Sequence, residues 1–295
     1  MKADRIRGSI VALVTPFRED GSVDFESLGN LIDFHLANRT DAILVLGTTG
    51  ESSAMSHEED DAVCEYTVKR VAGRVPVIAG SGSNCTQTML EKSLSFEKLG
   101  ADGLLLISPY YNKTNDEGMY LHFKTVADAV NIPCILYNVP GRTGCAISEN
   151  VVRRLAPHPN IAGIKEASGN LSYAANIARY LSDDFVMYSG NDDIILPMLS
   201  LGASGVISVL ANVVPAETHD MVTDYLEGDR GKALAAQLKY LDLIHAMFCE
   251  VNPIPVKEAL NLMGMQAGSY RLPLTRMAQP NRERLEAAMK EVGLL

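Results

Sequence analysis

The fold is decided by residues 161–170, IAGIKEASGN, in which four small or apolar residues lead directly into a lysine and a glutamate. An apolar run this short, followed by polar residues and glycine, is typical of a buried β-strand. Seven similar runs occur at residues 10–14, 42–46, 75–79, 103–107, 134–137, 185–188 and 205–209. They recur roughly every 20 to 35 residues with helical signals between them, which is the repeat of a βα unit. We therefore predict a (β/α)8 barrel of parallel strands covered by helices.

Helical signals fill the intervals between these strands. Ser56 and Glu59 form the ends of a predicted capping box, Pro197 falls early in one predicted helix and Pro215 opens another. Beyond Arg230 the strand signals stop, and helices are expected at residues 231–249, 255–263 and 281–292. We predict a catalytic barrel over residues 1–229 and a small all-helical domain over residues 230–295, packed on the barrel because its apolar positions need burial.

Composition restricts the function. The 295 residues are 47% hydrophobic with a net charge of −10, and no cluster of Lys or Arg forms a basic stripe, so we expect no nucleic-acid partner. We find no signal sequence and no run of 18 apolar residues, so we expect no membrane association. The five cysteines are widely spaced and never form a C-x-x-C pair, which suits a reducing compartment. A cytoplasmic protein is expected.

Lys165 is the principal candidate for chemistry because it ends an apolar strand, whereas most other lysines lie on polar helix faces. In a (β/α)8 barrel the carboxyl ends of the strands face the active site. Desolvation there disfavours the ammonium form and leaves an amine that can attack a carbonyl. The alternative is a structural ion pair with a barrel carboxylate, although Glu166 should point to the opposite side of the strand.

Two further strand ends carry residues suited to Schiff-base chemistry. The hydroxyls of Tyr137 and Thr48 can relay the protons that carbinolamine formation and dehydration require. Gly47, Thr48, Thr49 and Gly50 combine close backbone approach with hydroxyls able to bind a carboxylate. The alternatives are a core aromatic for Tyr137 and an ordinary βα turn for residues 47–50.

No cofactor or metal is expected. Residues 80–82, GSG, lack the full spacing of a nucleotide loop and the acidic residue that would follow it. The six histidines show no H-x-x-x-H or H-E-x-x-H pattern, and the acidic residues 58–61 fit the start of a helix, where carboxylates are favourable.

With these residues assembled, the chain resembles the pyruvate-dependent Schiff-base lyase and synthase family that includes dihydrodipicolinate synthase and N-acetylneuraminate lyase. The resemblance covers essentially the whole length, tail included. Its most specific parts are residues 47–51 (GTTGE), 109–112 (PYYN), 137–144 (YNVPGRTG) and 165–170 (KEASGN).

The resemblance implies a role for each site residue. Lys165 would bind pyruvate covalently, Thr49 and the backbone at Gly47 would hold the pyruvate carboxylate, and Ile207 would line the site through its backbone. The proton relay would comprise Tyr137, Thr48 and Tyr111. The residue matching Tyr111 serves the neighbouring subunit in this family, so a catalytic dimer within a homotetramer, a dimer of dimers, is implied.

Arg142 separates the synthases from the sialic acid lyases, which carry an uncharged residue at that position. A guanidinium at the rim can recognise the carboxylate of L-aspartate 4-semialdehyde. The resemblance therefore implies condensation of pyruvate with this aldehyde to give 4-hydroxy-tetrahydrodipicolinate and water, in diaminopimelate and lysine synthesis. The alternatives are a Schiff-base aldolase for another keto acid or sugar acid, and a non-catalytic keto-acid sensor.

A possible effector pocket departs from the family pattern. Ser52, His57, Asn84 and Tyr110 match it, but lysine-inhibited members have a glutamate where this chain has Thr88, and often a histidine at the position of Asp60. We expect weak lysine inhibition, although Asp60 is a carboxylate that could take the place of the missing one.

Overall fold

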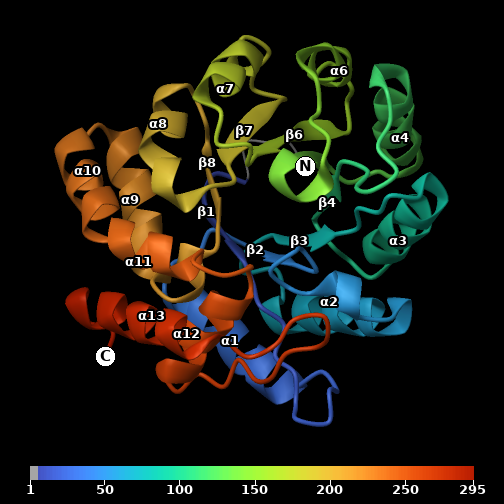
Figure 1. Ribbon diagram of the computed structural model, residues 1–295. Coiled ribbons are helices and arrows are strands. Elements are labelled where there is room, and N and C mark those ends of the chain that lie inside the picture. The colour runs from blue at the N-terminus through green and yellow to red at the C-terminus, as the bar shows by residue number, and fades with distance from the viewer. Residues whose placement is uncertain (1–5) are drawn as a thin grey trace.

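A computed structural model describes residues 6–295 of the chain as a closed barrel of eight parallel strands in sequence order (Figure 1). The barrel closes where β1 pairs with β8, and the predicted (β/α)8 architecture is confirmed. The strands are β1 (Gly8–Ala12), β2 (Ala42–Val45), β3 (Val77–Gly80), β4 (Gly103–Ile107), β5 (Cys134–Asn138), β6 (Ile161–Glu166), β7 (Val186–Ser189) and β8 (Gly205–Ser208).

Eight helices cover the outside of the barrel (Figure 1). They are α1 (Phe25–Ala37), α2 (His57–Val71), α3 (Thr86–Lys98), α4 (Asp116–Ala129), α6 (Glu149–Leu155), α7 (Leu171–Ala178), α8 (Ile195–Ser200) and α9 (Pro215–Glu227). Four short helical turns lie between strands and covering helices: η2 (Ser52–Ala54), α5 (Pro140–Thr143), η3 (Asp192–Ile194) and η4 (Leu210–Asn212). None of the helices in the described part of the chain is long and apolar enough to cross a membrane.

Local sequence explains where several helices begin. Ser56 accepts a hydrogen bond from the amide of Glu59, and the Glu59 carboxylate accepts one from the amide of Ser56, which is the predicted capping box of α2. Pro215 occupies the first position of α9, where its missing N–H costs nothing. These signals fix where α2 and α9 begin after strands β2 and β8.

The first strand begins earlier than predicted. The apolar run suggested residues 10–14, but pairing starts at Gly8 and Ser9, which lie opposite Gly205 and Val206 of β8. A glycine and a serine carry no apolar signal, so only the partner strand reveals that they belong to the sheet. Leu13 and Val14 then lie beyond the strand, in the buried segment that follows it.

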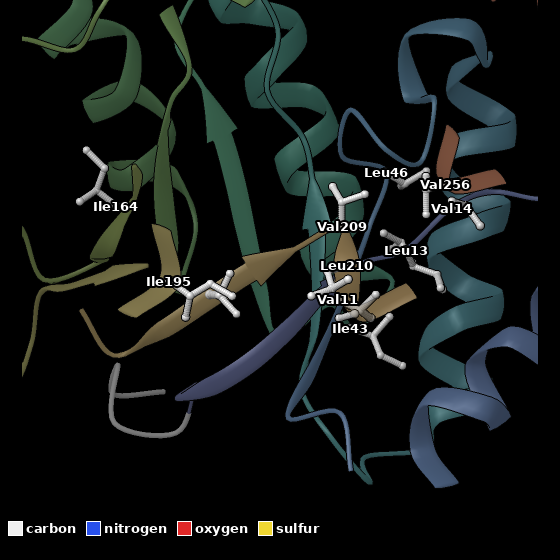
Figure 2. Close-up of a cluster of buried hydrophobic side chains, with 14 of the residues drawn as sticks. Val11, Leu13, Val14, Ile43, Leu46, Ile164, Ile195, Val209, Leu210 and Val256 are labelled. Carbon is white, nitrogen blue, oxygen red and sulfur yellow. The ribbon is translucent and has the colours of Figure 1, made fainter. Parts of the chain in front are cut away.

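Two apolar cores flank the sheet. Inside the barrel, residues such as Ile10, Leu44 and Ile135 pack against one another. The second core lies between the strands and the helices, and part of it is seen in Figure 2. Val256 belongs to this second core together with Val14 and Leu46. The C-terminal tail is thus packed into the body of the protein at the end of the barrel where strands β1 and β2 finish.

The tail contains one more helix than predicted. Residues 231–249 were expected to form a single helix, but the structure has α10 (Arg230–Lys239) and α11 (Leu241–Met247), followed by α12 (Ile254–Leu262) and α13 (Gln279–Glu291). Tyr240 breaks the expected helix with non-helical backbone angles while its side chain is buried, so tertiary packing overrides the local helical pattern. Since α10 packs directly on α9, the domain boundary at residue 229 stays a prediction.

Candidate active site

Lys165 lies at the carboxyl end of β6, inside the mouth of the barrel. It pairs in register with Tyr137 of β5 on one side and Tyr188 of β7 on the other. Its side chain is buried, and its Nζ atom is 4.4 Å from the centre of the Tyr137 ring. The parallel register therefore places an amine and a phenol side by side at the rim where barrel enzymes perform their chemistry.

Burial changes the protonation of this amine. The pKa of Lys165 is lowered to about 8: desolvation is the main cause, the negative charge of Asp192 opposes the shift, and the positive charge of Arg142 adds to it. At neutral pH about one tenth of such lysines carry a free amine, whereas a lysine of ordinary pKa is almost wholly protonated. Lys165 is thus prepared to act as a nucleophile.

Lys165 forms no ion pair with any carboxylate among residues 6–295. Glu166 is turned away, since its two carboxylate oxygens accept hydrogen bonds of 2.6 Å from the Asn138 side chain and the Ser168 amide. Asp192 lines the same cavity as Lys165, but its Oδ2 accepts bonds from the amides of Val209 and Leu210. The geometry therefore favours a free amine over a structural ion pair.

A cavity of about 310 Å³ opens above Lys165, large enough for a three-carbon keto acid and part of a second small molecule. Its polar lining comes from the ends of four strands, β2, β5, β6 and β7, and from the helical tail. The polar residues include Thr48, Thr49, Tyr137, Arg142, Lys165, Asn191, Asp192, His245 and Asn252. Apolar walls with few polar groups are typical of a small-molecule site.

Tyr137 has the environment of a proton-transfer group that starts in the neutral form. Burial raises the pKa of its phenol, while the charge of Arg142 and a hydrogen bond with the Thr48 hydroxyl oppose the shift. The proton is therefore retained on Tyr137 at neutral pH, and the neighbouring Thr48 hydroxyl offers a path for it to move along. The structure brings together Tyr137, Thr48 and Lys165.

Thr49 is buried, and its side chain is oriented by the tail. The Asn252 amide donates a 2.9 Å hydrogen bond to the Thr49 Oγ1 atom. Because the hydroxyl oxygen is already accepting, its own hydrogen is free to be donated to a ligand carboxylate. Gly47, which precedes the two threonines, lines the same cavity.

Arg142 stands at the entrance, on the short helix α5. Its side chain is exposed and donates a 3.4 Å hydrogen bond to the backbone oxygen of Asn252. Arg142 lines the cavity that contains Lys165, and a guanidinium in that place can bind a carboxylate through paired hydrogen bonds.

Two candidates lie away from this cavity. Ile207 is buried in the inner core of the barrel, and Val209 of the same segment lines the cavity in its place. Tyr111 is 90% exposed, adopts a positive φ of 69°, and lines neither this cavity nor the larger one described below. A single chain thus does not bring Tyr111 to Lys165.

Comparison with known proteins agrees with this geometry. The profile of the dihydrodipicolinate synthetase family matches residues 5–292. The chain belongs to this family. It is 54% identical over 288 residues to the 4-hydroxy-tetrahydrodipicolinate synthase of Caldicellulosiruptor bescii, which covers 98% of this chain and 97% of that protein. It is 50% identical to 4-hydroxy-tetrahydrodipicolinate synthase 1 of Clostridium acetobutylicum, over 98% of both chains.

Solved structures of dihydrodipicolinate synthases have the same fold. The structure from Aquifex aeolicus superposes with a TM-score of 0.95 at 47% identity, covering 98% of each chain. The structure from Cyanidioschyzon merolae with lysine bound superposes with a TM-score of 0.96 at 41% identity, covering 98% of this chain and 99% of that one.

Three of the four residues that the sequence suggested for an effector pocket line a second cavity, of about 480 Å³. Ser52, His57, Tyr110 and Thr88 contribute to its wall, whereas Asn84 does not and instead accepts a bond from Asn112 through its backbone oxygen. The two cavities are adjacent and share part of their walls: both are lined by Gly47, Thr48, Leu105, Tyr137 and Arg142.

A buried ion pair occupies one wall of this second cavity. Lys92 Nζ lies 2.7 Å from the Asp60 carboxylate and donates a 3.0 Å hydrogen bond to Ser52 Oγ. The Asp60 side chain is 1% exposed, and the same Ser52 hydroxyl donates to it at 3.1 Å. The negative charge of Asp60 is thus matched by a cation from within the chain.

Three residues of these cavities were given no role from sequence. Asp192 lies three residues after the end of strand β7, so the rule of reading the polar residues beyond each strand could have identified it. Asn252 comes from the tail and Lys92 from the middle of α3, and no local pattern marks either of them. Among residues 6–295 no group of three or more His, Cys, Asp or Glu side chains is placed to hold a metal ion.

Proposed function

We propose that the chain is a 4-hydroxy-tetrahydrodipicolinate synthase that condenses pyruvate with L-aspartate 4-semialdehyde in diaminopimelate and lysine synthesis. Relatives that are about half identical over nearly the whole chain bear this name. The observation that carries the proposal is the buried Lys165 amine, which has no carboxylate partner among the described residues and is adjacent to Tyr137. The chemistry is that of a lyase acting through a Schiff base, without a cofactor.

The first half of the reaction activates pyruvate. The Lys165 amine attacks the C2 carbonyl, the carbinolamine loses water, and an imine results. Tyr137 and Thr48 deliver the proton that lets the hydroxyl leave as water and accept the proton released by the amine. The Thr49 hydroxyl and the backbone at Gly47 hold the pyruvate carboxylate, which fixes C2 over the amine.

The second half forms the carbon–carbon bond. The imine loses a proton from C3 to give an enamine, whose C3 attacks the aldehyde carbon of the semialdehyde. The aldehyde oxygen takes up one proton to become the C4 hydroxyl, which balances the proton lost from C3. The amino group of the semialdehyde then displaces Lys165 from the imine carbon and closes the ring, so one water is released overall. Arg142 holds the semialdehyde carboxylate at the entrance through paired hydrogen bonds.

Tyr111 completes the proton relay in a neighbouring copy of the chain. Its 90% exposure and positive φ suit a side chain that projects from one copy into another. The active unit is then a dimer, and we extend this to a homotetramer built as a dimer of dimers. The enzyme acts in the cytoplasm on small-molecule substrates, with no nucleic acid and no membrane partner.

The proposal is tested by borohydride trapping in the presence of pyruvate, followed by peptide mass mapping. One reduced pyruvate is expected on the Lys165 peptide. The Lys165→Ala variant should fold but take up no label, and should lose several orders of magnitude in rate because covalent activation disappears. Labelling of a different lysine, or no labelling, would refute the mechanism.

A further inference from the structure

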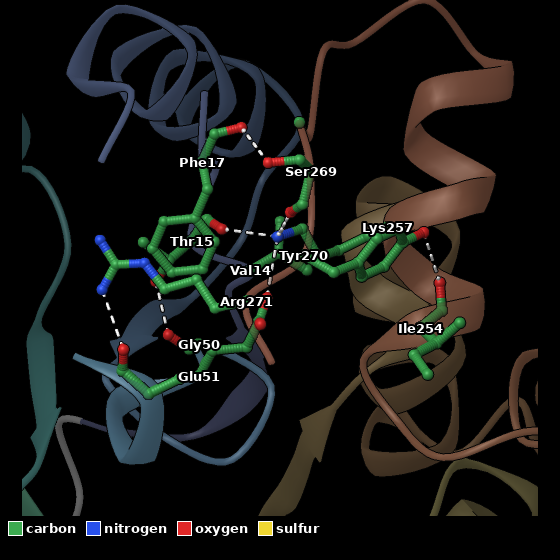
Figure 3. Close-up of polar contacts among 12 residues, drawn as sticks. Val14, Thr15, Phe17, Gly50, Glu51, Ile254, Lys257, Ser269, Tyr270 and Arg271 are labelled. Atoms are coloured by element: carbon green, nitrogen blue, oxygen red, sulfur yellow. Dashed lines mark hydrogen bonds and ion pairs between the residues drawn. The ribbon is translucent and has the colours of Figure 1, made fainter. Parts of the chain in front are cut away.

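Lys257 of α12 is a fully buried lysine that the reaction described above does not use. Its Nζ atom donates three hydrogen bonds: 2.8 Å to Glu51 Oε1, 3.1 Å to the Thr15 backbone oxygen and 2.5 Å to the Ser269 backbone oxygen. Figure 3 shows the ammonium between these groups. All three protons of the ammonium are therefore used, and they join the segments after β1 and β2 to the tail.

Glu51 ends the segment that carries the keto-acid binding residues, residues 47–51. It adopts a left-handed conformation, φ 55° and ψ 28°, which is uncommon for a residue other than glycine. Its carboxylate is 1% exposed. A left-handed conformation of this kind persists only where surrounding contacts hold it. Among the contacts of Glu51, the one with Lys257 is an ion pair.

The same segment is held at its other residues by neutral contacts. The Thr15 hydroxyl donates a 2.7 Å hydrogen bond to the Gly50 backbone oxygen, and the Asn252 amide reaches Thr49. Gly50 itself leaves little room for a side chain, since a Cβ atom there would lie 3.0 Å from the Leu46 amide nitrogen and 3.2 Å from the Leu13 backbone oxygen. Thr48 and Thr49 are thus fixed between Gly50 and Glu51 on one side and the barrel on the other.

A buried ion pair is a poor means of gaining stability, because desolvating both charges offsets most of their attraction. The rings of Phe17 and Tyr270 lie 4.5 and 5.3 Å from Lys257 Nζ, which recovers part of that loss. An apolar pair of similar volume would fill the space at comparable stability. Unlike an apolar pair, the charged pair is directional. The ammonium makes three hydrogen bonds in fixed directions, and they determine the position of the Glu51 carboxylate.

We infer that Lys257 and Glu51 are positioning residues that set the place of Thr48 and Thr49, and through them the affinity for the keto-acid carboxylate. This inference rests on the proposed function. It predicts that the helical tail is required for pyruvate binding although neither Lys257 nor Glu51 lines the cavity that contains Lys165.

The test compares Lys257→Met, Glu51→Gln and the double variant by the pyruvate concentration that gives half-maximal borohydride trapping at Lys165. This concentration does not depend on how much protein folds. Each single variant should raise it about tenfold, since small displacements of positioning groups have large effects. The KM for aspartate semialdehyde and the pH midpoint of trapping should stay unchanged within error, because Arg142 and Lys165 are not displaced.

The double variant separates position from stability. Removing both charges leaves no unpaired buried charge, so its melting temperature should recover towards that of the parent chain, while half-saturating pyruvate stays raised. Recovery of pyruvate affinity together with stability would overturn the inference, as would parental affinity in the single variants. A shifted pH midpoint would also overturn it, in favour of a direct electrostatic effect on Lys165.

Glu59→Gln is the matched control. Glu59 also pairs with the tail, through Arg271, but it lies in α2 and does not hold residues 47–51. Glu59→Gln should lower the melting temperature without changing the half-saturating pyruvate concentration. A rise in that concentration equal to the rise in the Lys257 and Glu51 variants would show that any loosening of the tail weakens pyruvate binding. Failure of the parent chain to trap pyruvate at Lys165 would instead refute the proposed function.

Discussion

Tyr137 and Lys165 are register partners on adjacent parallel strands, with the amine 4.4 Å from the centre of the phenol ring. Side chains of paired residues point to the same side of a sheet, so a single register fixes both their separation and their common access to the mouth. The ring also excludes water from one side of the amine. The desolvation that makes Lys165 nucleophilic thus comes partly from the group proposed to transfer its protons.

The rate of imine formation should rise with pH and level off above a midpoint near 8. Only the neutral amine attacks pyruvate, and the pKa of Lys165 is lowered to about 8, so the protonated form predominates below that pH. Trapping rates with pyruvate measured from pH 6 to pH 10 at constant ionic strength would check this. A rate still rising at pH 10 would indicate a lysine of ordinary pKa.

Replacing Arg142 with Ala should impair use of aspartate semialdehyde much more than formation of the pyruvate imine. Loss of a charge-assisted hydrogen bond of about 1.5 to 3 kcal/mol corresponds to roughly tenfold to hundredfold in kcat/KM for the aldehyde. Half-saturating pyruvate should change by less than about threefold. For Arg142→Lys, kcat/KM for the aldehyde should lie between the values of the parent chain and of Arg142→Ala, because a lysine keeps the charge but not the paired hydrogen bonds. Equal losses for both substrates would mean that Arg142 only supports the structure.

Mixing an inactive Tyr111→Phe chain with an inactive Lys165→Ala chain should restore activity. In a mixed dimer one site receives Lys165 from the first chain and Tyr111 from the second, and random exchange should give at most about a quarter of parental activity. Native mass spectrometry would measure subunit exchange alongside the rate. Complete exchange without activity would place Tyr111 in the site of its own chain.

Lysine should inhibit weakly. Thr88 lacks the charge of a carboxylate, and the Asp60 carboxylate is already paired with Lys92, so an incoming ammonium finds no free anion in this wall. Replacing Lys92 with Met should leave the Asp60 charge unmatched and lower the lysine concentration for half inhibition about tenfold. Steady-state rates across a lysine titration at fixed pyruvate would give the lysine concentration for half inhibition in both chains. Strong inhibition of the parent chain at micromolar lysine would contradict this explanation.

Sequence reasoning was sufficient wherever the information is local. Eight short apolar runs predicted the strands, and the residue after each run led to Lys165, Tyr137 and Thr48 at one rim. It was insufficient wherever a contact joins distant segments. Asn252 reaches Thr49 across 203 positions, and Lys92 reaches Asp60 from the adjacent helix α3. Tyr240 broke a predicted helix because its burial depends on how the tail packs, which no pattern within residues 231–249 shows.

The separation of Lys257 from Glu51 affects the protein while the ribosome is still making it. Glu51 leaves the ribosome 206 residues ahead of Lys257, which corresponds to roughly 10 to 40 s of translation. Strand β1 likewise cannot complete its pairing until β8 has been synthesised, since Gly8 pairs with Gly205. The nascent chain presents unpaired strand edges until β8 has emerged, and a keto-acid binding segment without its anchor until Lys257 has emerged. Chaperone capture should therefore concentrate on chains shorter than about 260 residues, and the ability to bind pyruvate should arise only at the end of synthesis.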